Sequence, residues 1–245
     1  MMMDQNIKNT KAAFAKVFGS PGEAPIIIGL VKAFWPLLLI CFLLGYIFRA
    51  IWIQPYLSQS QAGFILVVIS ISGFLFLFLG GRKLNNYLKG ARGEEWVSNQ
   101  LAFLDYNYSI FNGIKLENGK HNFDHVVLSP FGLFLVETKN WSGKISFSNN
   151  RISIDNKYLK KSPIKQLKDD TLELINYLNN NNLKSIPVKP ILCFLESELD
   201  NPVININGVI ICSGESLIEV LSDELNDKID SHLSIETEKV LLELV

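Results

Sequence analysis

Hydrophobic residues are distributed in two distinct ways in this sequence. Residues 24–53 are apolar apart from two cationic side chains, and residues 62–79 carry no charge at all. Each of these runs is long enough to cross about 30 Å of hydrocarbon as a helix. After residue 90 the apolar positions recur instead at the spacing of amphipathic helices and strands. The distribution predicts two transmembrane helices followed by a soluble domain.

The soluble part alternates between strand-like and helix-like segments. Short apolar or alternating runs bounded by turn residues predict strands, and longer runs with apolar positions three and four apart predict helices. One α/β domain with a mixed sheet flanked by helices is the simplest arrangement of these segments. The predicted strands are residues 108–116, 122–128, 133–139, 144–147, 151–154, 157–159, 188–195, 203–206 and 209–212, and the predicted helices are residues 94–104, 162–178, 215–221 and 235–244.

Glu94 is expected to face the core from the first of these helices. The glycines of Gly90–Gly93 predict a break between the second apolar run and this helix. Val97 and Leu101 then begin a buried stripe, and Glu94 shares their side of the helix whereas Glu95 does not. An acid in the first turn also suits the helix dipole, which is the ordinary explanation for either residue.

A hairpin between Asp124 and Lys139 carries the most informative charge pattern. If Ser129–Gly132 forms its turn, Asp124 lies directly opposite Glu137, at about 4.5–5.5 Å between Cβ atoms. Both faces of the hairpin are largely apolar, so the repulsion between two such acids must be compensated. A divalent cation would compensate it, and strand alternation puts Lys139 on the same face. The pattern favours a metal site beside an ammonium group, with a solvated surface hairpin as the alternative.

Charged residues around the apolar runs predict the membrane topology. The chain is 48% hydrophobic, and the excess lies in its first third. A cleaved signal peptide is the competing interpretation, which the length of the first run and the presence of a second disfavour. The connection of residues 54–61 is uncharged, whereas cations flank the two runs, so both termini are expected in the cytoplasm of a bacterial-type inner membrane. The flanking cations are Lys8, Lys11, Lys16, Arg82, Lys83, Lys89 and Arg92. The predicted division is a cytoplasmic segment of residues 1–23, a two-pass membrane region of residues 24–89 and a cytosolic domain of residues 90–245.

Charge is segregated within the cytosolic domain. Residues 90–245 carry 15 basic and 22 acidic side chains, a net charge of −7, which disfavours general binding of polyanions. Residues 139–168 nevertheless hold 8 basic side chains against one acid, and the local field at a cleft is what steers a charged ligand. A nucleic-acid contact and a solvated lysine-rich face are equally compatible with this segment. The candidate substrate-binding residues are Lys144, Arg151, Lys160, Lys161 and Lys165.

Four motifs in order resemble the nuclease-related domain, or NERD, family. They are Gly90-x-x-Gly93-Glu94, Phe123-Asp124-His125, Gly132-x-Phe134-x-Val136-Glu137-Thr138-Lys139-Asn140-Trp141-x-Gly143 and Pro163-x-x-Gln166. The resemblance covers about residues 90–212. It implies a restriction-endonuclease-like fold of the PD-(D/E)xK superfamily, in which an Asp is followed by Glu-x-Lys on a mixed sheet flanked by helices.

The resemblance also implies roles for individual residues. Magnesium, with Mn²⁺ as an expected substitute, would be held by two carboxylates and a carbonyl, an arrangement that leaves room for substrate because Mg²⁺ keeps several waters. Without the resemblance, Gln166 would be interpreted as a solvated polar residue on a helix. The implied metal ligands are Asp124, Glu137 and the Thr138 carbonyl; Lys139 would orient water or stabilise charge, with Glu94 and Gln166 as further catalytic residues.

The expected function is that of a membrane-anchored, Mg²⁺-dependent nuclease that hydrolyses phosphodiester bonds, with DNA as the expected substrate. The alternative is a catalytically inactive module that binds nucleic acid or protein at the inner face of the lipid bilayer. A third possibility is a structural membrane protein whose helices form a homo-oligomer through small residues. The small residues available for such contacts are Gly29, Gly45, Gly63 and Gly73.

Overall fold

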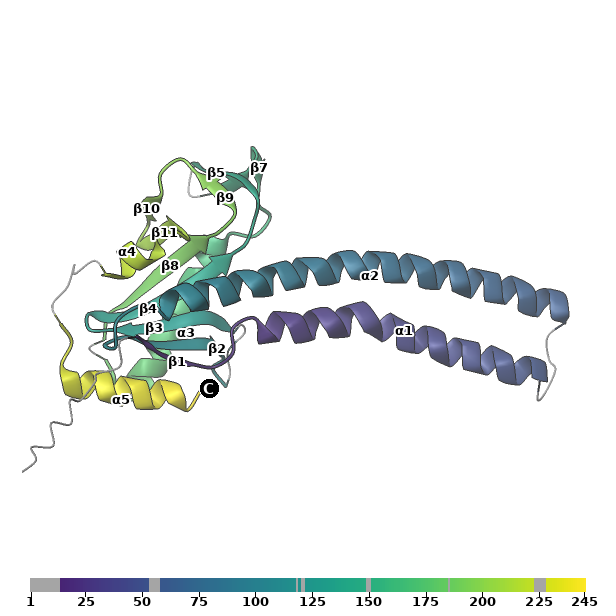
Figure 1. Ribbon diagram of the computed structural model, residues 1–245, viewed down its shortest axis with the longest axis horizontal. Helices are drawn as coiled ribbons and strands as arrows, with labels where there is room; N and C mark the ends of the chain where they lie inside the picture. Colours follow the sequence, from purple (N-terminus) through teal and green to yellow (C-terminus); the bar gives the residue numbers. More distant parts are fainter. Residues whose placement is uncertain are drawn as a thin grey trace, which may run out of the picture. The chain divides into compact units, whose positions relative to one another are not determined.

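The computed structural model describes residues 14–52, 58–117, 119, 122–148, 151–184, 186–222 and 228–245 (Figure 1). Lys8, Lys11, residue 53 at the end of the first apolar run and residues 54–57 of the predicted connection lie outside the described residues. The chain forms two compact units, and residues 14–22 belong to the same unit as Arg92–Val245. The other unit is Glu23–Ala91. The predicted fold class is confirmed: two long apolar helices accompany a mixed sheet flanked by helices.

Helix α1 (Glu23–Trp52) and the first part of helix α2 (Gln59–Leu101) make up the unit Glu23–Ala91. Small residues let the two helices approach closely: a Cβ on Gly80 would lie 3.1 Å from the Ala33 carbonyl oxygen, and one on Gly29 would lie 2.7 Å from the Cβ of Tyr87. Both helices are long and apolar enough to cross a membrane. Only 17% and 11% of their most apolar segments are buried, which distinguishes them from the core helices of a soluble protein.

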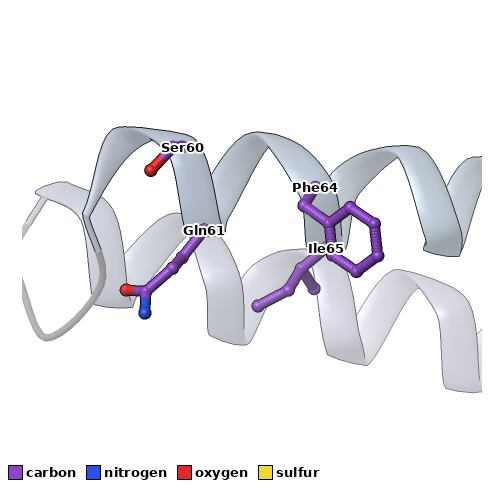
Figure 2. A pocket seen from close by; sticks show the side chains of 4 residues that line it. All are labelled: Ser60, Gln61, Phe64 and Ile65. Carbon is purple, nitrogen blue, oxygen red and sulfur yellow. The ribbon is translucent and has the colours of Figure 1, made fainter.

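A shallow hollow of about 390 Å³ lies at the start of α2 (Figure 2). Its walls are side chains from the first two turns of the helix, and Figure 2 shows Gln61 and Ile65 one turn apart. The lining residues are Ser60, Gln61, Phe64 and Ile65, none of which is titratable. This hollow therefore offers no acid or base that could activate the Ser60 hydroxyl.

Helix α2 runs without interruption through Gly90–Gly93, so the predicted helix break is wrong. Glycine inside a helix costs only about 1 kcal/mol relative to alanine, and the surrounding turns outweigh that cost. Gly93 has a packing role instead, because a Cβ there would lie 2.8 Å from the Cβ of Asn140. The predicted buried stripe is confirmed, with Val97 and Leu101 fully buried.

Seven strands of the described chain form the main sheet, in the order β1-β2-β3-β4-β8-β11-β10. Strand β3 is antiparallel to its neighbours β2 and β4, whereas β4, β8 and β11 are parallel. The bounds are β1 Lys16–Phe18, β2 Ser109–Ile114, β3 Phe123–Ser129, β4 Gly132–Lys139, β8 Val188–Phe194, β10 Val203–Ile206 and β11 Val209–Ser213.

Strand β1 is the element of the main sheet that the sequence did not indicate. It pairs in parallel with β2, with Val17 opposite Ile110, and the ring of Phe18 stacks on that of Phe111 at 5.2 Å between centroids. Three residues are too few to show a period of two, so only the pairing partner reveals the strand. The segment before α1 is therefore part of the same fold as the domain after α2.

A smaller sheet has the order β7-β6-β5-β9 among the described residues. Its strands are β5 (Gly143–Ser148), β6 (Arg151–Ile154), β7 (Lys157–Tyr158) and β9 (Ser197–Leu199). The first three match the predicted segments, whereas β9 was not predicted. It pairs in parallel with β5, a contact between segments more than fifty residues apart that no local pattern signals.

Helices cover both faces of the main sheet (Figure 1). Helix α3 (Pro163–Asn180) and helix α5 (Ser231–Leu242) pack on one core, and the end of α2 and helix α4 (Leu217–Ser222) pack on the other. Helix α3 begins as predicted, with the Ser162 hydroxyl accepting the Lys165 N–H and Pro163 in the first turn. Alternate residues of β3 and β4 thus face α3 on one side and α2 on the other.

Candidate active site

The hairpin of β3 and β4 positions the candidate acids. Leu128 pairs with Leu133 as predicted, and the pairing runs outward to His125 opposite Val136. The same register places Asp124 and Glu137 across from each other on the α3 side of the sheet. At the turn, the Ser129 hydroxyl accepts the Phe131 N–H at 3.1 Å and donates to the Gly132 carbonyl at 2.9 Å, which holds the register.

Beyond the last backbone pair of the hairpin, the Asp124 side chain takes the place of a backbone hydrogen-bond acceptor. Its Oδ2 accepts the backbone N–H of Thr138 at 2.8 Å, which holds the carboxylate over the end of β4. Burial raises the pKa of Asp124 well above its usual range, and the charges of Glu137 and Glu94 raise it further. Lys139 and the Thr138 N–H oppose this rise. A cation close to Asp124 would favour its ionised form, as Lys139 does.

Glu137, Lys139 and Gln166 form a bonded group. Lys139 Nζ donates to Glu137 Oε1 at 2.5 Å, and Gln166 Nε2 donates to the same oxygen at 3.4 Å, a long hydrogen bond. The Glu137 side chain is 9% exposed and that of Lys139 is 19% exposed. Burial lowers the pKa of Lys139, but the charges of Glu137 and Asp124 outweigh this and raise the pKa overall. Lys139 is therefore a protonated cation at neutral pH.

Glu94 approaches this group from α2. Glu94 is buried as predicted, whereas its neighbour Glu95 is exposed. The Oε2 atom of Glu94 accepts the N–H of Gly22 at 3.0 Å. Burial raises the pKa of Glu94 to about 7, the Gly22 hydrogen bond opposes the rise, and the charge of Glu137 adds to it. A residue of the segment before the first helix thus holds a candidate catalytic acid, a contact that no sequence pattern indicated.

The donor atoms suit Mg²⁺ better than a softer metal. No group of three or more His, Cys, Asp or Glu side chains within reach of one ion occurs in the described part of the chain, so at most two side-chain acids could share an ion. Mg²⁺ is bound by one or two carboxylates and keeps several waters, which matches Asp124 and Glu137. The N–H and carbonyl of a strand residue point to the same side, so the Thr138 carbonyl also faces the Asp124 side of β4. These three groups are the ones that would hold the ion.

The candidate substrate-binding cations lie on exposed surface. They come from the small sheet, from the connection before α3 and from the first turn of α3. Lys144 pairs with Asp200 at 2.8 Å and Lys165 pairs with Asp169 at 3.0 Å, so two of the five are partly neutralised. The five exposed cations are Lys144, Arg151, Lys160, Lys161 and Lys165.

A buried polar chain on the opposite face supports the hairpin. His125 Nδ1 lies 2.7 Å from Asn112 Oδ1, and Asn112 Nδ2 donates to Ser98 Oγ at 2.9 Å. Burial lowers the pKa of His125 to about 3, so the ring is neutral and can link β2 and β3 to α2. His125 faces away from Asp124, as the strand alternation predicted. Asn112 and Ser98 were not predicted, because their role exists only where strand and helix meet.

The fold and the site define an α/β domain in which acids, a lysine and a glutamine meet at the end of a hairpin. Residues 89–195 match the family model of NERD, the nuclease-related domain. This part of the chain is therefore similar to NERD domains, and the resemblance carried by the four motifs is confirmed. The match ends after β8 and thus before residue 212, to which the motif resemblance extends. No curated protein and no solved structure matches the chain.

Proposed function

We propose that this protein is a membrane-anchored nuclease of the PD-(D/E)xK type that hydrolyses phosphodiester bonds, with DNA as substrate and Mg²⁺ as cofactor. The observation that carries the proposal is the meeting of Asp124 and Glu137 at the end of one hairpin, with Lys139 bonded to Glu137. The nuclease-related family match supports the same class of reaction.

The residues of the cluster supply what phosphodiester hydrolysis requires. The reaction needs an oriented water and stabilisation of negative charge that gathers on the phosphoryl oxygens. When bound, Mg²⁺ supplies Lewis-acid stabilisation of that charge. Because its pKa is raised, Lys139 keeps its proton and acts as a donor that orients water or stabilises charge rather than as a base.

Glu94 and Gln166 are placed to support this chemistry. Gln166 donates to the Glu137 oxygen that also accepts from Lys139, so it helps to fix the orientation of that carboxylate. Glu94, with its pKa near neutrality, can hold or release a proton beside the cluster. Its bond to Gly22 fixes where that proton would be.

The fold also supports two membrane passes. Strand β1 precedes α1 and pairs with β2, which follows α2, so both ends of the helical pair must lie on one side of a membrane. Two spans satisfy that requirement, and the flanking cations support a cytoplasmic location of this side at a bacterial-type inner membrane. The nuclease domain would then act on nucleic acid at the cytoplasmic surface.

The test uses the full-length protein in detergent, because a fragment that begins at residue 90 would lack β1 and Gly22. Fluorescent single- and double-stranded DNA is incubated with Mg²⁺ or with a chelator, and the products are resolved on gels. Wild type is expected to cut only with Mg²⁺. Lys139→Ala and Asp124→Asn should abolish cutting without loss of circular dichroism, whereas Lys184→Ala, at an exposed turn, should cut normally. Cutting that persists with the chelator or in Lys139→Ala contradicts the proposal.

A module that binds without catalysis is the second candidate. The net charge of −7 over residues 90–245 and the acidic partners of Lys144 and Lys165 weaken the field that a polyanion would meet. Calorimetric binding of Mg²⁺ combined with no cleavage of either DNA or RNA would favour this candidate. Loss of that Mg²⁺ binding in Asp124→Asn would then assign the ion to the same site.

A further inference from the structure

Another hollow lies in the unit that contains Arg92–Val245, at the point where three parallel strands end. Its volume is about 320 Å³, and its walls include residues that directly follow β4, β8 and β11. Ligands of open α/β sheets bind outside the carboxyl ends of the strands, so the position is one that folds of this kind use for binding. The residues that matter for recognition are Arg92, Trp96, Asn140, Glu196, Gly214 and Glu215.

Trp96 gives the hollow an aromatic wall. The residue lies on α2 and is 40% exposed, and a Cβ on Gly214 would lie 2.8 Å from its Cζ3 and 3.1 Å from its Cη2. One edge of the indole therefore packs against Gly214, while much of the ring remains accessible. An accessible aromatic ring in a pocket is the platform on which unpaired bases stack. Pockets for small ligands measure about 300–1,000 Å³, so this one takes a single base rather than a duplex.

The charges around the hollow favour a base over a phosphate. Arg92 contributes one cation, whereas Glu196 and Glu215 contribute two carboxylates, all exposed. The Ser142 hydroxyl donates to Glu196 Oε2 at 3.0 Å, which orients this carboxylate. Carboxylates accept hydrogen bonds from exocyclic amino groups and repel phosphate, and the Asn140 amide can both donate and accept. Arg92 can contact the backbone phosphate beside the base.

The hollow adjoins the candidate active site through two pairs of neighbouring residues. Gly93 precedes Glu94 on α2, and Asn140 follows Lys139 at the end of β4. The side chain of Asn140 lies against α2, since a Cβ on Gly93 would be 2.8 Å from its Cβ. Lys139 points to the other side of the strand, toward Glu137. A strand whose phosphate lies at the cluster could therefore place a base across the end of β4.

We infer that this hollow binds one unpaired, amino-bearing nucleobase of the substrate, stacked on Trp96. The inference rests on the proposed function, because it requires a nucleic-acid strand at the cluster. It identifies the substrate as single-stranded, or as a duplex from which a base is extruded. Trp96 and the two glutamates are not the acids that would hold the metal, so the pocket can be altered without removing those acids.

The test measures binding of short fluorescent oligonucleotides to the full-length protein in detergent with Mg²⁺. The oligonucleotides are oligo(dT) strands with phosphorothioate linkages that contain one central dC, dT or abasic position. Wild type is expected to bind the dC strand more tightly than the dT strand, and the abasic strand most weakly. Trp96→Ala should weaken binding of the dC strand about 5- to 150-fold, the equivalent of about 1–3 kcal/mol for one stacked base.

Combining the protein substitution with the change in the oligonucleotide distinguishes loss of stacking from a structural effect of the substitution. In Trp96→Ala the abasic position should cost nothing further, while Trp96→Phe should retain most of the discrimination. Phe103→Ala, which removes another exposed aromatic of the same unit, should behave as wild type. Equal weakening of the dC and abasic strands by Trp96→Ala, or equal binding of both strands by wild type, would overturn the inference.

Cleavage of ordinary DNA, measured separately, distinguishes this inference from the proposed function. Base-dependent binding without Mg²⁺-dependent cleavage supports the pocket and refutes the nuclease. Cleavage with no Trp96-dependent discrimination supports the nuclease and refutes the pocket. Absence of any oligonucleotide binding by wild type refutes both.

Discussion

Replacement of Glu94 by glutamine should make the stability of the protein less dependent on pH. Glu94 is 9% exposed and accepts the N–H of Gly22 at 3.0 Å. Glutamine has nearly the same volume and retains a side-chain oxygen that can accept this N–H. The substitution therefore removes the ionisation of the group while it keeps the hydrogen bond and the packing.

The pKa of Glu94 determines the expected magnitude. Burial raises this pKa from 4.5 to about 7, with a further contribution from the charge of Glu137. Between these two values the unfolded chain has released a proton that the folded chain retains, so the free energy of unfolding falls as the pH rises. At about 1.4 kcal/mol for each pH unit, wild type loses about 3 kcal/mol by the time the pH exceeds about 7. Glu94→Gln avoids that loss and should match wild type at low pH.

Thermal unfolding of the full-length protein in detergent with a chelator provides the assay. A change of 1 kcal/mol shifts Tm by about 2–4 °C for a chain of this size, so Glu94→Gln should melt about 6–12 °C above wild type at about pH 8 and near wild type at about pH 5. Glu95→Gln, at the exposed neighbouring position, is the matched control: it keeps Glu94 and should melt like wild type at both pH values. A difference between Glu94→Gln and wild type that stays constant with pH would refute the reasoning.

Two further predictions concern packing. Gly93→Ala should lower the free energy of unfolding by about 1–3 kcal/mol, because the added Cβ would press on Asn140. Gly90→Ala should raise it by about 0.5–1 kcal/mol, since no described residue outside the helix backbone and the chain neighbours lies within 4 Å of that position. Equal effects of the two substitutions in denaturant titrations would contradict the packing role of Gly93. Phe18→Ala should lower the free energy of unfolding by about 1–3 kcal/mol through loss of its stacked contact and buried area, and Val17→Ala, at a 43% exposed position, should have little effect. Unchanged thermal melting of Phe18→Ala would show that β1 does not stabilise the domain.

Local patterns were sufficient for the hairpin and for the start of α3. Alternating apolar residues and the Ser129–Gly132 turn specify one register, because a shift by one residue would move every side chain to the other face. Leu128 accordingly pairs with Leu133, and the acids follow from that register. Ser162 and Pro163 likewise specify the helix start through their own backbone preferences.

The continuity of α2 was not predictable from the same kind of signal. Gly90–Gly93 has the composition of a helix break, yet the helix continues, and Gly93 lies against Asn140 at the end of β4. A glycine needed for close approach and a glycine that ends a helix are identical in sequence. The difference lies in a partner more than forty residues away.

The order of residues thus determined the two apolar helices, the hairpin and the parity that puts Asp124, Glu137 and Lys139 on one face, since each depends on neighbours within a few positions. Only the tertiary structure decided that β1 joins β2, that Gly22 bonds Glu94, and that Trp96 lines a hollow beside Asn140. These contacts join segments separated by tens of residues. Their formation depends on which surfaces become buried together when the chain folds, and no periodicity along the chain records that choice.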